Sequence, residues 1–378
     1  MAKRLLVIGG GAAGLAAAVE GAGCGAHVTL LERADRVGKK ILQTGNGRCN
    51  LSNLSVSPDA YNAPDFVAPV LEALPSMSIR GFFEDLGLLT YADSEGRVYP
   101  ISDAAASVLD VLRLAVRDGG VQTLCGAEAV SLSPDGTVKT ADGGTHHGDA
   151  VIVASGGGTA LLESAGHTIV PFSPILCPLK TDTALIRGLS GQRVRCGVTL
   201  KRRGETVVSL RGEVLFRDYG VSGIVIFDLS RYAKKGDQIL LDLFPDMEYK
   251  ELCKLLFQRQ RLFPGRAEEE FLTGLFQSRI AAALLRAAGG AEPKALATLI
   301  KGLPLQVQGC GDPKQAQVTR GGAALAEFDP VTLRSRLAPR LFAAGEALDI
   351  DGRCGGFNLH WAFASGITAA RAAMEDLL

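Results

Sequence analysis

The chain has no excess of charge of either sign. Its 378 residues contain 40 Lys and Arg and 40 Asp and Glu, so the formal net charge at pH 7 is zero. Proteins that bind nucleic acids or anionic membranes usually carry a basic excess. The balance therefore predicts no nucleic-acid partner and no membrane partner.

Long apolar runs are also missing. The segment 5–19 is the best candidate near the start, but glycines interrupt it and it is shorter than the ~20 residues that a membrane helix requires. Basic residues precede this segment, as in a signal peptide, yet no cleavage-site pattern follows it. We therefore expect a cytoplasmic protein.

The eight cysteines show no C-x-x-C spacing, so the sequence predicts neither a zinc site nor a dithiol redox pair. In a reducing compartment most of these side chains are expected to be small buried hydrophobes. No metal site of any kind is predicted.

Glycine, in contrast, is abundant, and its first cluster is informative. Four apolar residues, 5–8, predict a buried strand, and Gly9, Gly11 and Gly14 after it fit the pattern G-x-G-x-x-G. In a dinucleotide site the first glycine permits a tight turn, the second lets a pyrophosphate approach the backbone, and the third lets a helix pack against the sheet. The phosphates then lie at the positive end of that helix.

A second predicted strand, 27–31, ends at Glu32, 18 residues after Gly14. A carboxylate at this position is suited to accept hydrogen bonds from an adenosine ribose. A strand, a glycine turn, a helix, a second strand and an acidic residue thus follow one another at the spacing typical of a dinucleotide site, and we predict such a site here. A glycine-rich packing turn is the alternative.

Two later loops are polar and rich in glycine. Residues 44–53 include two glycines, three asparagines and one arginine, and residues 349–358 combine glycines with acidic residues and Asn358. Loops of this composition offer many N–H and amide groups to a polar ligand. We expect the first of them to contact a ligand rather than to be a surface turn.

The order of predicted elements gives the architecture. Strands and helices alternate up to about residue 158, which is typical of a mostly parallel sheet. Between 174 and 244 we predict strands at 193–200, 206–210, 213–216 and 238–243, with no long helix between them, as in an antiparallel sheet or small barrel. Residues 249–302 have helical spacing, and from 319 the α/β pattern returns, ending in a helix from about residue 360 to 377.

The predicted fold is therefore α/β, a Rossmann-like nucleotide-binding domain with an insert. We expect this domain to comprise residues 1–172 and 317–378, a β-barrel insert 173–245 and a helical subdomain 246–316.

Several segments together resemble the HI0933-like flavoproteins, also called BaiN-like or aminoacetone-oxidase-like oxidoreductases. The matching residues span the whole chain and lie at 9–14 with Glu32, 38–40, 44–50, 220–223, 318–322, 345–346 and 355–359. The blocks Thr-Gly-Asn-Gly-Arg-Cys-Asn and Gly-Gly-Phe-Asn-Leu are the specific ones. The resemblance implies FAD rather than NAD, in a glutathione-reductase-like domain built from both chain ends.

It also implies a set of cofactor-binding residues. The first glycine turn would hold the pyrophosphate, the loop 45–50 would line the isoalloxazine, and the turn 355–359 would face the flavin pyrimidine edge. The residues expected to bind FAD are Gly9, Gly11, Ala12, Ala13, Gly14, Glu32, Arg33, Lys40, Thr44, Gly45, Asn46, Gly47, Arg48, Cys49, Asn50, Ala129, Val130, Ala154, Ser155, Gly156, Gly345, Glu346, Gly355, Gly356, Phe357, Asn358 and Leu359.

The sequence departs from the family pattern at three places. Arg217-Asp218-Tyr219 replaces a Thr-His-Tyr type of segment, Ile224 replaces Pro, and His360 replaces Gln. His360 is a candidate proton donor because imidazole titrates near neutral pH, with a structural hydrogen bond as the alternative. Tyr219 and Cys49 are further catalytic candidates, with core packing and an inert buried thiol as their alternatives.

The expected activity is that of an FAD-dependent oxidoreductase acting on a small molecule. The resemblance suggests NAD(P)H-dependent reduction of a conjugated, steroid-like ketone, and oxidation of an amine or aminoketone by oxygen is the competing reaction. No second G-x-G-x-x-G is found, so NAD(P)H would bind transiently. An FAD-dependent RNA-modifying protein and a non-catalytic flavin sensor remain as other classes. Substrate, electron donor and oligomeric state stay open.

Overall fold

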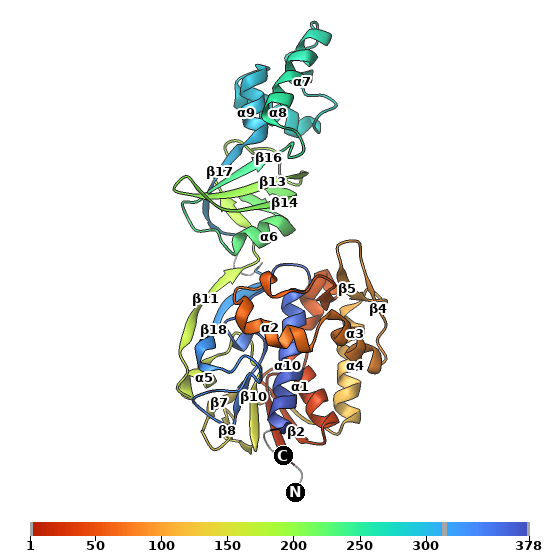
Figure 1. The fold of residues 1–378 in the computed structure, drawn as a ribbon, viewed down its shortest axis with the longest axis vertical. Coiled ribbons are helices and arrows are strands. Elements are labelled where there is room, and N and C mark those ends of the chain that lie inside the picture. Colours follow the sequence, from red (N-terminus) through yellow and green to blue (C-terminus); the bar gives the residue numbers. More distant parts are fainter. Residues whose placement is uncertain (1–2, 312–315, 376–378) are drawn as a thin grey trace. The chain divides into compact units, whose positions relative to one another are not determined.

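The computed structural model describes residues 3–311 and 316–375, and the chain divides into two compact units (Figure 1). Unit 1 comprises Met1–Ser173 and Val318–Leu378, and unit 2 comprises Pro174–Gln317. Unit 1 thus contains both chain ends, and unit 2 is one continuous insertion.

Unit 1 is built on a five-stranded sheet in which every neighbouring pair is parallel. Strands buried on both faces are continuously apolar in sequence, and β1 and β10 have this character. The strand order is β19 (Leu341–Ala343), β10 (Ala150–Val153), β1 (Arg4–Ile8), β2 (His27–Glu32) and β6 (Gln122–Cys125).

Helices α1 (Ala12–Gly23) and α10 (Phe357–Glu375) lie side by side along this sheet, and α4 (Ala105–Asp118) packs beside α1 (Figure 1). The small residues of α1 and α10 let the two backbones approach closely. A Cβ at Gly366 would overlap the carbonyl oxygen of Ala13. The two ends of the chain therefore share one core.

Shorter elements surround this core. β5 pairs with both β4 and β3 in a three-stranded antiparallel sheet. A second antiparallel sheet contains β7, β8 and β9, and β11 pairs with β18. Their bounds, with those of the remaining helices of unit 1, are β3 Ser52–Asn53, β4 Thr90–Ala92, β5 Arg97–Pro100, β7 Ala129–Leu132, β8 Thr137–Thr140, β9 Thr145–His147, β11 Ile169–Ile175, β18 Val318–Ala323, α2 Pro64–Ala73, α3 Ser76–Asp85 and α5 Ala160–Ser164.

Unit 2 contains a closed six-stranded barrel whose neighbouring strands are antiparallel. Alternate apolar residues of the strands, such as Val198, Leu200 and Leu241, fill its interior. The strands are β12 Leu179–Thr181, β15 Gly220–Ser222, β14 Glu205–Arg217, β13 Arg193–Arg202, β16 Gln238–Asp242 and β17 Leu303–Cys310, and the helices are α6 Ile224–Ser230, α7 Tyr249–Leu262, α8 Ser278–Ala288 and α9 Pro293–Lys301.

The α/β fold with an inserted antiparallel barrel is thus confirmed, but two predicted boundaries were wrong. Residues 206–210 and 213–216 belong to the single strand β14, because Gly212 is not a turn residue. It pairs with Cys196, and a side chain there would press against Val225 of α6. The last helix begins at Phe357 rather than near residue 360.

In the part of the chain that the structure describes, every helix is too short or too polar to span a bilayer.

Candidate active site

The turn after β1 uses its glycines in two different ways. Gly9 has φ of +103°, and a Cβ there would lie 2.5 Å from the Ala154 carbonyl oxygen, while a Cβ at Gly14 would overlap the Gly9 carbonyl oxygen. These two glycines are required by the packing of the protein itself. At Gly11, in contrast, a Cβ would meet no atom within 4 Å.

Gly11 is also the residue from which helix α1 begins. Among the described residues no side chain caps this end of α1. The first N–H groups of a helix lack partners within the helix, and the helix dipole makes this end positive. Open space at Gly11 in front of an uncapped helix end suits a pyrophosphate.

The carboxylate of Glu32 fixes the same turn from the neighbouring strand. It accepts hydrogen bonds from the backbone N–H groups of Gly10 and Ala34, each at 2.7 Å. Each carboxylate oxygen keeps a second lone pair. Holding the turn is therefore compatible with accepting a hydrogen bond from a ribose.

Because all five strands are parallel, the loops after β1, β2, β10 and β19 meet at one edge of the sheet. The Ala344 N–H donates to the Val153 carbonyl at 3.0 Å, so the loops that follow β10 and β19 run together. Lys40 pairs with Glu346 at 3.2 Å, and a Cβ at Gly156 would lie within 4 Å of both side chains. This edge thus joins loops from both ends of the chain.

The polar loop 44–53 packs directly against the start of α10. Asn53 donates its amide N–H to the Gly355 carbonyl at 2.9 Å, and a Cβ at Gly356 would overlap the Ser52 carbonyl oxygen. Gly355 and Gly356 have φ of +118° and +101°, which disfavour other residues. The two specific sequence blocks are therefore in contact.

One buried atom of this contact lacks a partner. The Asn50 Oδ1 has no hydrogen-bond donor among the described residues, and a Cβ at Gly356 would approach it to 2.7 Å. A buried acceptor left unpaired costs about 1–3 kcal/mol. An N–H donor on a ligand would satisfy it, as the pyrimidine ring of FAD can. The cradle at Gly11 and the acceptor at Asn50 both fit FAD.

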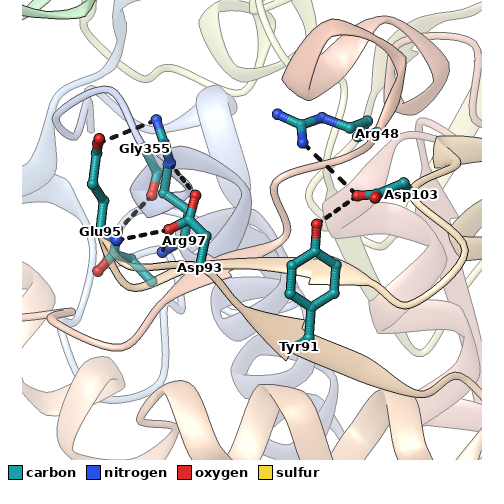
Figure 2. Close-up of polar contacts among 8 residues, drawn as sticks. Arg48, Tyr91, Asp93, Glu95, Arg97, Asp103 and Gly355 are labelled. Atoms are coloured by element: carbon teal, nitrogen blue, oxygen red, sulfur yellow. Dashed lines mark hydrogen bonds and ion pairs between the residues drawn. The ribbon is translucent and has the colours of Figure 1, made fainter.

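A polar cluster lies beside the loop that contains Arg48 (Figure 2). The Arg48 guanidinium lies 4.5 Å above the centre of the Tyr99 ring and 3.8 Å from the Asp103 carboxylate. Tyr91 donates its hydroxyl hydrogen to Asp103 at 2.7 Å, and this hydrogen bond raises the pKa of Tyr91. The cluster combines an accessible cation with a phenol.

The second group in Figure 2 anchors the β4–β5 hairpin. Arg97 donates to Asp93 at 2.7 Å and pairs with Glu95 at 3.2 Å. Although burial opposes the shift, hydrogen bonds from Arg97 lower the pKa of Asp93. The aliphatic part of Arg97 reaches the position of Gly355. The hairpin is thereby fixed against the loop before α10.

His360 lies in the core. Its side chain has no exposed surface, and Nδ1 forms a hydrogen bond of 2.9 Å with Ser52, which in turn contacts Ser76 at 3.0 Å. Burial lowers the pKa of His360 to about 4, although the backbone of Leu74 partly offsets this effect. A neutral, enclosed ring is suited to a structural hydrogen bond through Nδ1, and its Nε2 has no hydrogen-bond partner among the described residues.

Cys49 is likewise enclosed. It has no exposed surface, and burial raises its pKa to about 12, so the thiol is protonated at neutral pH. Since the thiolate is the nucleophile, this environment is that of the inert buried thiol. Tyr219 lies in unit 2, half-buried in the turn between β14 and β15.

The remaining predicted cofactor residues occupy varied positions. The N–H of Ala127 donates to the Glu32 carbonyl, so the segment leading to Ala129 and Val130 begins beside the end of β2. Arg33 and Val130 are exposed. Ser155 donates to the Gly158 carbonyl at 2.5 Å and closes the turn after β10.

Four residues of these two groups were not predicted from the sequence, namely Tyr91, Tyr99, Arg97 and Asp103. The segment 90–100 does contain a signal, because β-prone residues on both sides of Asp-Ser-Glu-Gly favour a hairpin. Nothing in the sequence, however, places that hairpin beside Arg48.

Fold and site together define a flavin oxidoreductase. A family model described as "HI0933-like protein Rossmann domain" matches residues 3–372. The chain is 36% identical to the 3-dehydro-bile acid delta(4,6)-reductase of Clostridium scindens, with 99% of both chains covered. It is 26% identical to the ribosomal RNA dihydrouridine synthase of Escherichia coli, covering 99% of this chain and 97% of that one.

A solved structure of 3-ketosteroid-delta4-(5alpha)-dehydrogenase from Rhodococcus jostii is similar in fold, with a TM-score of 0.50 and 14% identity, covering 98% of this chain and 97% of that one. The chain belongs to the HI0933-like family. Membership of this flavoprotein family implies FAD as the cofactor.

Proposed function

We propose that the protein reduces a carbon–carbon double bond conjugated to a ketone, in a steroid-like substrate such as a 3-oxo bile acid. The observation that carries this proposal is the 36% identity, over 99% of both chains, to a bile acid reductase. At this identity and coverage the same fold and the same flavin site are expected in both proteins.

FAD, once reduced by a nicotinamide, would supply the hydride for the electron-poor carbon of the double bond. The chain has to hold the substrate and deliver a proton. Arg48, about half exposed, is placed to attract a carboxylate on the substrate. Tyr91 is the partly accessible hydroxyl of the same cluster, and its hydrogen bond to Asp103 orients it. We assign Tyr91 as proton donor and Arg48 as a binding residue.

The electron donor in this proposal is NADH or NADPH. The glycine pattern at Gly9 serves FAD, and the sequence has no second such pattern. NAD(P)H would therefore bind only transiently.

The test uses the FAD-loaded protein under nitrogen with NADH or NADPH and a 3-oxo-Δ4,6 bile acid. We expect nicotinamide oxidation that depends on the enone, and a product heavier by two hydrogens. Tyr91→Phe should lower kcat at least about tenfold, whereas Tyr232→Phe, an exposed tyrosine in unit 2, should not. Oxygen uptake with an amine or aminoketone, and no enone reduction, would overturn the proposal.

A second function, dihydrouridine synthesis in ribosomal RNA, is favoured by the charge of unit 2. Residues 174–317 contain 22 Lys and Arg against 15 Asp and Glu, a net charge of +7, and the rest of the chain contains 18 against 25, a net charge of −7. The 5,6 double bond of uracil is conjugated to a carbonyl, so its reduction is the same type of reaction. A basic unit provides the phosphate contacts that RNA binding requires.

Binding of ribosomal RNA at two salt concentrations separates the two functions. An RNA-modifying protein should bind RNA with an affinity that falls steeply with salt. Reversing charge at the exposed Arg195 and at Lys201 of β13 should weaken this binding, and reversing the exposed Arg117 of unit 1 should not. Salt-independent or absent binding would exclude the second function and leave the first.

A further inference from the structure

Cys177 and Cys310 lie in the segments through which the chain enters and leaves unit 2. The chain enters this unit at Pro174 and leaves it at Gln317. Cys177 lies just after the entry, and Cys310 ends β17 shortly before the exit. The sequence alone gave no reason to pair them, because 132 residues separate them.

Backbone pairing brings these segments together. Leu179 of β12 is the register partner of Cys310, and the Gly311 N–H donates to the Pro178 carbonyl at 2.7 Å. Leu176, directly before Cys177, has a left-handed φ of +48° and turns the chain at this point. The two cysteines are therefore held next to each other on neighbouring antiparallel segments.

The two thiols also influence each other, because Cys310 is a near neighbour of Cys177. The Cys177 backbone N–H donates to the Ser230 hydroxyl at 3.2 Å. The side chains differ in access, since Cys177 is 1% exposed and Cys310 is half-buried. Burial and the neighbouring thiol raise the pKa of Cys177 to about 12. Cys310 is thus the member of the pair that an external reagent meets first.

We propose that Cys177 and Cys310 are a redox-active pair that forms a reversible disulfide by exchange with a small disulfide such as oxidised glutathione. The Cys310 thiolate attacks one glutathione sulfur, which forms a mixed disulfide and releases one glutathione thiolate. Cys177 is protonated at neutral pH, so the second step is the slower one: the thiol loses its proton to solvent, attacks the adjacent Cys310 sulfur and releases the second glutathione. The two protein thiols lose two electrons and two protons, and the glutathione disulfide gains them.

The disulfide would join the entry and exit segments covalently. Cross-links that close long loops restrict the unfolded chain most strongly, and this one encloses nearly the whole of unit 2. The pairing of the two segments keeps the cysteines close together, so little backbone movement is needed to form the bond. Oxidation should therefore raise the melting temperature of the protein by several degrees, and dithiothreitol should reverse the rise.

The experiment incubates the full FAD-loaded chain with mixtures of reduced and oxidised glutathione, blocks free thiols and maps the peptides by mass spectrometry. We expect a peptide pair linked through Cys177 and Cys310 and a single midpoint in the glutathione titration. Cys125, which is exposed, should carry glutathione instead and reports that the oxidant has acted.

Variants provide the controls. Cys310→Ser changes a half-buried residue and should abolish both the linked peptide and the rise in melting temperature, and Cys125→Ser should leave both unchanged. Cys177→Ser should instead trap glutathione on Cys310. Glutathione on Cys125 without any Cys177–Cys310 link, at every ratio tested, would overturn the proposal.

Discussion

Two glycines of the first turn are required by the packing of the protein itself, and a third is open to a ligand. Gly9 and Gly14 are needed because side chains there would collide with backbone atoms, but Gly11 faces open space. The sequence contains the G-x-G-x-x-G pattern and predicts a separate role for each glycine. Only the structure shows that Gly11, unlike Gly9 and Gly14, could carry a side chain without a clash inside the protein.

Gly11→Val should therefore weaken the binding of FAD while leaving the protein folded. The valine side chain would compete with the pyrophosphate at a cost of about 1–3 kcal/mol, which weakens binding by about 10–100-fold. Gly23→Val at the other end of α1 also meets no atom and serves as the control. Absorbance near 450 nm after gel filtration measures the bound flavin. Full flavin content in Gly11→Val would contradict this placement of the phosphates.

His360 shows how the environment of a residue changes the chemistry that its type suggests, because burial lowers its pKa to about 4. The family resemblance placed His360 directly after the loop 355–359, which is expected to face the flavin. The rotation of α10 that turns the imidazole toward Ser52 and into the core depends on packing with β3 and α3. Neither contact leaves a signal in the sequence.

The buried histidine should make stability depend on pH. Its pKa is about 4 in the folded protein and about 6.5 in the unfolded chain. Below pH 6.5 the unfolded chain binds a proton that the folded protein excludes, so stability is lost as pH falls toward 4, by on the order of 3 kcal/mol. His360→Gln should lack this loss when urea unfolding is compared at pH 7.5 and pH 4.5. Equal losses in both proteins would show that the ring is not the cause.

At the scale of elements, the sequence predicts best where periodicity is strong. The parallel strands β1 and β2 were expected at 5–8 and 27–31, near their observed bounds, because apolar spacing directly encodes burial. Strand β14 was predicted as two strands, 206–210 and 213–216, and the β4–β5 hairpin was not predicted. Both depend on tertiary neighbours, Val225 of α6 in one case and the loop before α10 in the other.

Close contact between α1 and α10 should be sensitive to a single methyl group. Gly366→Ala adds a Cβ that would overlap the Ala13 carbonyl oxygen, and we expect a net loss of about 1–3 kcal/mol despite the better helix propensity of alanine. Gly23→Ala in the free end of α1 should instead be neutral or stabilising by up to about 1 kcal/mol. Chemical unfolding measures both. A stabilised Gly366→Ala would mean that the helices can separate at no cost.

At the scale of the whole molecule, the net charge is zero although the charges are unevenly distributed between the two units. The expectation of no nucleic-acid partner came from the net charge of the chain, although unit 2 carries +7 and unit 1 carries −7. The boundaries of a compact insertion have to be known before its charge can be counted. Composition alone therefore could not test the function that the ribosomal RNA relatives suggest.

Both ends of the chain contribute strands to one sheet, so the ligand site at the edge of that sheet joins distant parts of the sequence. The loops at residues 9–14, 44–53 and 344–358 meet at one edge of unit 1, so FAD should link segments that are more than 300 residues apart in sequence. Ligands that bind only the folded state stabilise it by mass action. Hydrogen exchange of the FAD-loaded and FAD-free protein should therefore differ mainly in these three loops. The amides of β13 and β16 in the barrel are the internal control and should exchange equally in both. Protection gained in the barrel, with none at residues 9–14 or 344–358, would place the flavin elsewhere.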